Sequence, residues 1–210
     1  MQNNDTVKFG LFRILLVSSI LLLGACSANI MVESPSPNVE PPAADKAVIV
    51  FMRSSFVASA IDAVLFEVVN GEIELVGGVP NGTKVAHVTE PGEKVYMGAG
   101  VGMGSGADFM LARVEKGKTY YSILRPNWGS GAFIPTPIKT DGTTEFNTDI
   151  PEFGKWVNGT RLLSKKPDSD KWFQQHKDKF QKMYERYWEK FNTKTADQIQ
   201  ERTMMPSDGS

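Results

Sequence analysis

The sequence predicts a mainly β protein: an antiparallel β-sandwich, Ig-like or jelly-roll-like, of seven or eight strands, with a C-terminal amphipathic α-helix packed on it. Short strand-like runs separated by turn residues fill residues 46–140, and this spacing is typical of sandwiches and barrels. Residues 172–191 carry apolar side chains at steps of three and four, which is the period of a helix. Hydrophobic residues make up 41% of the 210 residues, enough to build a core.

Residues 1–25 are predicted to be a signal peptide rather than part of the fold. Lys8 and Arg13 precede an apolar run over residues 14–23, which is shorter than the roughly 20 residues that span a bilayer. The run ends in Leu-Gly-Ala-Cys, with the cysteine at Cys26. This ending resembles the lipobox of bacterial lipoproteins.

The resemblance implies a lipid anchor at Cys26. The chain would be cut before this residue, and acyl chains on its thiol and on its new amine would hold the protein in the membrane. Ser27 follows it and is compatible with outer-membrane sorting in enteric-type bacteria, so the expected location is the outer membrane, facing the periplasm. The alternative is an ordinary signal peptide, or a membrane helix, with a chance cysteine.

Residues 26–45 are predicted to be a tether. They are rich in Pro and Ser and nearly free of core-forming side chains. Such segments favour an extended conformation of about 3.1 Å per residue, so about 18 residues could hold the domain up to roughly 50 Å from the bilayer.

The β-sandwich domain is predicted over residues 46–140. Residues 47–52 form a continuous apolar run, which is typical of a strand buried on both faces. Asn70 and Gly71 predict a two-residue hairpin turn, because both positions favour positive φ. Further strands are expected at 63–69, 72–76, 84–88, 94–97, 109–114, 119–124 and, as a proline-containing edge strand, 131–138.

Glycines alternate with other residues from Gly98 to Gly106. A dinucleotide-binding G-x-G-x-x-G motif would need a third glycine at position 103, where Met103 stands, and a helix after it. The next predicted element is instead a strand from Phe109. We therefore expect a mobile hairpin loop here, with a phosphate-binding loop as the weaker alternative.

Residues 141–166 are expected to connect the sandwich to a helical segment over 167–210. Asp168 is a candidate N-cap for the long helix, and Thr195 with Gln198 predicts a capping box for a short second helix. The aromatic stripe of the long helix could dock on the sandwich, or lie on a membrane or in a partner's groove. Because the opposite face carries both signs of charge, docking is expected.

Several stretches together resemble the small bacterial lipoproteins grouped as domain of unknown function 2846. The resemblance covers most of the chain after the signal peptide and rests on the order and spacing of turn and strand motifs. It implies a β-sandwich with no assigned reaction and no catalytic residues. The matching stretches are 47–55 (AVIVFMRSS), 80–83 (PNGT), 90–92 (EPG), 115–121 (EKGKTYY), 151–156 (PEFGKW) and 205–209 (MPSDG).

Composition excludes several kinds of site. A single cysteine allows neither an intrachain disulfide nor a cysteine-based zinc site. The formal net charge of −1 gives no electrostatic case for nucleic-acid binding. His87 and His176 stand apart without other ligands at zinc-binding spacing, and no G-x-S-x-G motif is present. We therefore assign no metal, no cofactor and no catalytic residue.

Four residues are candidates for binding. Arg53 ends the apolar strand and Asp62 opens the next one, so Arg53 could form an ion pair or bind an anion. Tyr121, Arg125 and Trp128 bring aromatic rings beside a guanidinium near one sandwich end. They could form a contact patch, or simply pack in the core and its rim.

Three functions stay open at this point. The leading one is a non-catalytic binding or adaptor module, anchored to the membrane through Cys26 and able to bind an envelope protein. The second is a hydrolase-like enzyme with a shallow site near Arg53, Asp62 and His87, which requires these residues to converge in one pocket. The third is a structural component of the envelope.

Overall fold

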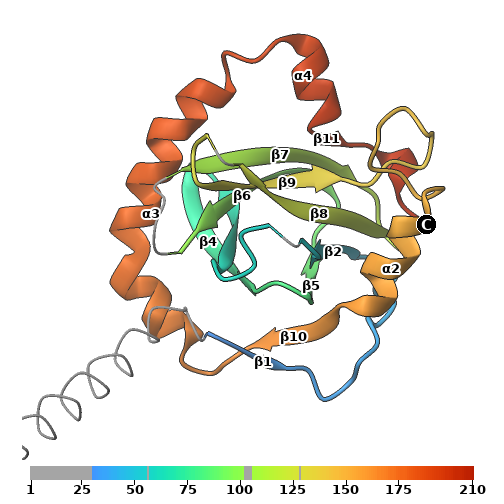
Figure 1. Ribbon diagram of the computed structural model, residues 1–210, viewed down its shortest axis with the longest axis horizontal. Coiled ribbons are helices and arrows are strands. Elements are labelled where there is room, and N and C mark those ends of the chain that lie inside the picture. Colours follow the sequence, from blue (N-terminus) through green and yellow to red (C-terminus); the bar gives the residue numbers. More distant parts are fainter. Residues whose placement is uncertain (1–29, 56, 102–105, 128) are drawn as a thin grey trace, which may run out of the picture.

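The computed structural model describes residues 30–55, 57–101, 106–127 and 129–210. Two mixed sheets pack face to face and a long C-terminal helix covers one of them (Figure 1), which confirms the predicted mainly β, sandwich-like fold. Sheet A has the order β1 (Met31–Glu33), β10 (Arg161–Lys165), β5 (Thr83–Thr89), β2 (Ala47–Arg53), β8 (Thr119–Asn127) and β9 (Ala132–Pro137). Sheet B has the order β11 (Thr203–Met204), β7 (Ala107–Val114), β6 (Gly92–Gly100), β3 (Ala63–Val69) and β4 (Glu72–Val79).

Strand directions are mixed rather than uniformly antiparallel. The pairs β2–β8, β5–β10 and β7–β11 are parallel, whereas the neighbours β3–β4, β6–β7 and β8–β9 are antiparallel. The antiparallel neighbours follow one another in the chain, with two residues between β3 and β4, six between β6 and β7, and four between β8 and β9. The parallel partners are separated by other elements, so no hairpin constrains their direction.

Strand β2 is buried on both faces, as its apolar run predicts. Ala47, Ile49 and Phe51 point between the sheets into the main core. The alternate residues of β2 point outward into a second core, which α2 (Pro151–Gly159) covers with Phe153 and Trp156. Both faces of β2 are therefore packed over residues 47–52, which explains why its apolar run is continuous.

Helix α3 (Ser169–Phe191) docks on the outer face of sheet B, as predicted. The Phe66 ring lies 5.9 Å from Phe173 and 4.8 Å from Phe180, centroid to centroid. Further along, Phe109 contacts Trp188 at 5.1 Å. Burial of each such aromatic side chain contributes roughly 1.5–3 kcal/mol. After it, α4 (Ala196–Glu201) begins at the predicted capping box.

Two segments that carry no predicted secondary structure contribute to the fold. Residues 141–166 contain α2 and β10, and β10 pairs with β5 inside sheet A. Within residues 26–45, β1 pairs with β10, and the side chains of Ile30 and Met31 are buried over Gly78. Within the described residues, packing therefore already includes Ile30 and Met31 rather than starting near residue 46.

The described glycines of the 98–106 stretch allow two sheets to meet closely. A Cβ at Gly98 would lie 2.2 Å from the carbonyl oxygen of Phe133, and one at Gly106 would lie 2.0 Å from that of Ser130. Any larger residue would therefore push β6 and β7 away from β9. Met103 and its neighbours 102–105 lie outside the described residues.

The last residues of the chain pack against the sandwich. Beyond β11, a single turn, η1 (Pro206–Asp208), places the buried carboxylate of Asp208 3.2 Å from the Nζ of buried Lys139. Lys139 Nζ also donates to the carbonyl oxygen of Thr203, and Ser210 exchanges backbone hydrogen bonds with Thr119. The C-terminal tail is therefore an integral part of the core.

Candidate functional site

The three residues of the enzyme hypothesis do not form one pocket. His87 faces Ile49 in the β2–β5 register, and Arg53 lies four residues further along β2. At about 3.3 Å per residue, the two positions are roughly 13 Å apart. Asp62 lies near Arg53 and away from His87, since it interacts electrostatically with the guanidinium. The interior of the sandwich therefore has two separate charged ends.

Arg53 is fully buried at the first of these ends. Its guanidinium donates to the carbonyl oxygens of Val79 at 3.2 Å and Ala58 at 2.5 Å, and it lies 4.3 Å from the ring centroid of Phe133. Burial lowers its pKa to about 10, against a smaller opposing effect of Asp62. Because these contacts tie the 54–62 loop to β4 and β9, we interpret Arg53 as a structural clamp.

The second end holds an ion triad that sequence reasoning missed. The carboxylate of Glu67 lies 2.7 Å from His87 Nε2 and 3.3 Å from Lys94 Nζ. Burial raises the pKa of Glu67, but His87 and Lys94 outweigh it and leave this pKa lowered. A cleft of ≈ 350 Å³ between β4 and β10 reaches this triad. The Glu67 carboxylate thus holds the His87 ring by a hydrogen bond and balances the charge of Lys94, which ties β3 to β5 and β6.

Tyr121 and Arg125 lie on the outer face of sheet A and not beside Arg53. Arg125 lies 4.2 Å from the ring centroid of Phe146, and its Nε donates to Thr136 Oγ1 at 2.9 Å. Tyr121 contacts Phe153 of α2 edge to face at 5.2 Å and lines a different hollow from Arg125. Tyr121 and Arg125 therefore do not share one contact patch, as was predicted for them together with Trp128. Trp128 itself lies outside the described residues.

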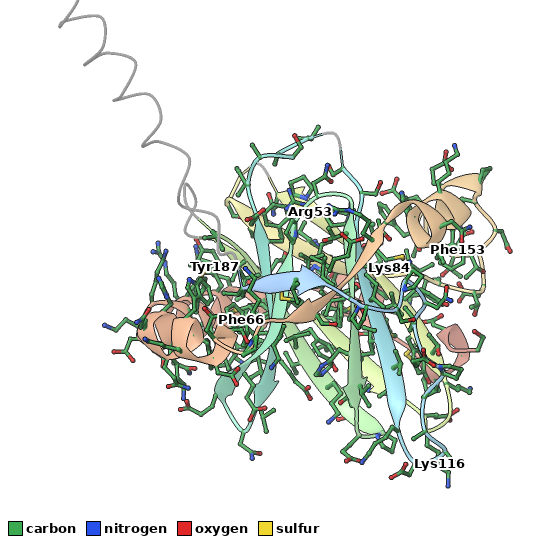
Figure 2. The ribbon with its side chains drawn as sticks, turned by 90° about the horizontal axis from the view of Figure 1, so that it is seen from below. Arg53, Phe66, Lys84, Lys116, Phe153 and Tyr187 are labelled. Carbon is green, nitrogen blue, oxygen red and sulfur yellow. The ribbon has the colours of Figure 1, made fainter. Side chains whose placement is uncertain are left out.

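Tyr121 belongs instead to a polar groove, here named the Lys84 groove, of ≈ 650 Å³. Its floor is the outer face of sheet A at β2, β5 and β8, one wall is the C-terminal end of α2 with the start of β10, and the other wall is the segment 33–39. Figure 2 shows Lys84 on the side of the sheet that α2, marked by Phe153, covers. The lining residues are Glu33, Ser34, Pro35, Pro37, Asn38, Val39, Val50, Lys84, Tyr121, Val157, Asn158, Thr160, Arg161 and Leu162.

Lys84 dominates the chemistry of this groove. Only 7% of the residue is exposed, and its Nζ donates to the carbonyl oxygen of Val157 at 2.6 Å, at the negative end of α2. Within the described part of the chain it forms no ion pair, and burial lowers its pKa. An ammonium carries three donors, so two remain for a further acceptor.

The neighbours of Lys84 suit a polar ligand. Burial raises the pKa of Tyr121, so its hydroxyl stays protonated and can donate. The exposed amide of Asn158 lies at the groove's edge, and Arg161 pairs with Glu33 at 3.0 Å across the rim. The groove thus offers one buried cation and several neutral donors and acceptors to whatever enters it.

Other site types and known relatives give no further guide. Among the described residues no group of three His, Cys, Asp or Glu side chains could hold a metal ion, and no helix is long and apolar enough to cross a membrane. A scan against models of known protein families and a search of the curated proteins find no match for this chain. The resemblance to domain of unknown function 2846 therefore stays a prediction, as does the anchor at Cys26, which lies outside the described residues.

Proposed function

We propose that the protein is a lipid-anchored bacterial envelope protein that acts as a non-catalytic binding or adaptor module, and that its ligand places an anionic group in the Lys84 groove. The observation that carries this proposal is Lys84 itself: a buried cation without a carboxylate partner in the described chain, open to a polar groove. A buried charge is stable only when it is paired or well hydrogen-bonded. A carboxylate or phosphate group of a ligand would complete the pairing.

Binding is favoured over hydrolysis by the composition of the groove. Its described lining residues include neither histidine nor cysteine. The Thr160 hydroxyl donates to the carbonyl oxygen of Trp156. Lys84 Nζ donates to the carbonyl oxygen of Val157 rather than to a hydroxyl group, so the expected hydrogen bond between a nucleophile and its base is not formed by this lysine. What they offer is a buried ammonium, a phenol and an amide, which select a ligand by charge and hydrogen bonding.

The anchor gives the groove a fixed setting. Segment 33–39 forms one wall and follows Cys26 by only a few residues. A ligand bound there would be attached to the membrane through the anchored domain, as expected of an adaptor between the membrane and an envelope partner.

The anchor is tested by Cys26→Ser in the full-length protein. We expect loss of radiolabelled palmitate incorporation and release of the protein from membranes. Ser27→Ala is the matched control and should leave both unchanged. Full palmitate labelling of Cys26→Ser would contradict the lipoprotein proposal.

The groove is tested by placing a photo-cross-linking residue at Asn158, with the same residue at exposed Lys116 as the control. We expect an adduct from position 158 alone, and its loss when Lys84→Met is added or when excess phosphate or acetate competes. An adduct that does not depend on Lys84, or that forms equally from position 116, would contradict this binding site.

A further inference from the structure

We infer that the domain lies against an anionic phospholipid surface through a basic stripe on α3. The stripe consists of the exposed residues Lys171, Lys179, Lys182, Arg186 and Lys190. This inference rests on the lipid anchor of the proposed function and adds to it the orientation in which the anchored domain is held.

The stripe is continuous along the helix and its charges are available. Its members follow one another at steps of three, four or eight residues and therefore share one face for roughly 30 Å. None of the five forms an ion pair within the described chain, whereas their neighbour Lys177 pairs with Glu72 at 2.8 Å. Arg186 and Lys190 only contact the ring of Tyr187, at 5.6 and 5.0 Å from its centroid.

The stripe stands out against the charge of the whole protein. Residues 165–194 hold nine Lys and Arg against five Asp and Glu, a formal charge of +4 in a chain whose total is −1. Of the exposed acidic side chains of α3, Asp178 and Glu185 lie along one border of the stripe and Glu189 lies within it, so the five basic residues remain in excess on this face. An anionic surface would therefore attract α3 and repel most of the remaining molecule.

The anchor point lies at one end of α3. Ile30 is buried, and its carbonyl oxygen accepts a hydrogen bond from the backbone N–H of Lys166, three residues before the helix. Only three residues lie between Cys26 and Ile30, and the four steps from one to the other span at most about 14 Å. The bilayer is then within reach of α3, and the 50 Å spacing expected from a long tether is excluded for a chain anchored at Cys26.

Apolar insertion of α3 is a different arrangement, which the packing opposes. The aromatic stripe of the helix is turned toward sheet B, where Phe66 and Tyr187 mark the junction in Figure 2. What α3 offers outward is charge, so the contact is electrostatic and should weaken with salt.

The test uses the lipidated full-length protein in vesicles. Because Cys26 is the chain's single cysteine, an introduced cysteine gives one free thiol for a fluorophore. Gln175→Cys lies on the stripe between Lys171 and Lys179. Lys116→Cys lies in a turn at the bottom of Figure 2, away from α3. Nitroxide-headgroup lipids then report which label touches the surface.

In phosphatidylglycerol vesicles we expect severalfold stronger quenching at position 175 than at 116, and a loss of this difference in pure phosphatidylcholine or at about 1 M salt, where the Debye length is about 3 Å. Lys179→Glu with Arg186→Glu should lower the quenching of the label at position 175 to the level of the label at 116. The matched pair Lys116→Glu with Lys155→Glu should leave the quenching at position 175 unchanged. Protein that does not float with vesicles would overturn the anchor and this inference together. Protein that floats but shows equal quenching at both positions, or quenching unaffected by the α3 reversal, would overturn only the orientation.

Discussion

Two buried lysines of this protein stand in opposite situations. Lys139 is 5% exposed, and the fold surrounds its ammonium with the carboxylate of Asp208 at 3.2 Å and the carbonyl oxygen of Thr203. Lys84 is 7% exposed, yet its only described acceptor is the carbonyl oxygen of Val157. The first is closed by the C-terminal tail, and the second opens into a groove.

The difference between the two lysines separates a charge that stabilises the fold from one that is available to a ligand. The pairing of Lys139 uses residues nearly 70 positions apart and ties the tail to the sandwich. Lys84 also reaches a distant residue, the carbonyl oxygen of Val157, but no carboxylate of the described chain completes its pairing, and a polar groove takes that place. A buried charge that has no ion-pair partner within the fold does not serve stability, and such departures from ordinary pairing are expected at functional sites.

The largest expected effect is on the closed lysine. Asp208→Ala leaves the Lys139 ammonium buried and unpaired, which should lower the free energy of unfolding by about 3–5 kcal/mol. Urea unfolding followed by tryptophan fluorescence measures this. The double variant Lys139→Met with Asp208→Leu removes both charges and should recover most of the loss. A loss of less than about 1 kcal/mol for Asp208→Ala, the worth of an exposed pair, would erase the contrast between the two lysines.

The open lysine should respond in the reverse sense. Lys84→Met replaces a desolvated cation by an apolar side chain of similar size, so the free energy of unfolding should stay within about 1 kcal/mol or rise. The Lys84-dependent adduct at position 158 should disappear. Lys116→Met on an exposed turn controls for the loss of one charge. A destabilisation as large as that of Asp208→Ala would make Lys84 structural and remove the reason to propose a ligand.

Sequence patterns predicted the parts of the fold that have a period. Strand β2 and the aromatic face of α3 were both predicted, because a continuous apolar run and a three-to-four spacing each imply one geometry. The short strands β1 and β10 were missed, since three to five residues show no reliable period. Their place depends on partners far along the chain.

The groove was missed for the same physical reason. Lys84 sits at the start of an expected strand as an ordinary charged residue, and it is buried only because Val157, 73 residues later, lies over it at the end of α2. Nothing local signals that contact. Tyr121 was predicted as a binding residue, but together with Arg125 and Trp128 rather than with Lys84. Arg53 was expected near Asp62, as the structure has it, but not sealed between the sheets.

A carboxylate placed in the groove should make Lys84 resemble Lys139. Asn158→Asp puts an acid at the groove's edge, where it would stabilise the charged ammonium and raise the pKa of Lys84. Nζ-detected NMR titration measures this shift, and binding of the anionic ligand should weaken in parallel. Asn192→Asp on an exposed helix end is the matched control. If the pKa of Lys84 stays unchanged in Asn158→Asp, position 158 is too far from the ammonium for a group there to pair with it.

The smallest expected effect is the pH dependence that Lys84 contributes to the free energy of unfolding. Burial lowers the pKa of Lys84 below its ordinary 10.5, so between the native and the unfolded value the unfolded chain binds more protons. The free energy of unfolding contributed by Lys84 therefore rises as pH rises through that window. Subtracting the curve of Lys84→Met from that of the native chain isolates this slope. A bound anion stabilises the ammonium and restores its pKa, so the slope should flatten when ligand is present. A slope that a saturating ligand leaves unchanged would mean that the anion binds elsewhere, because no anion can pair with Lys84 without changing its proton affinity.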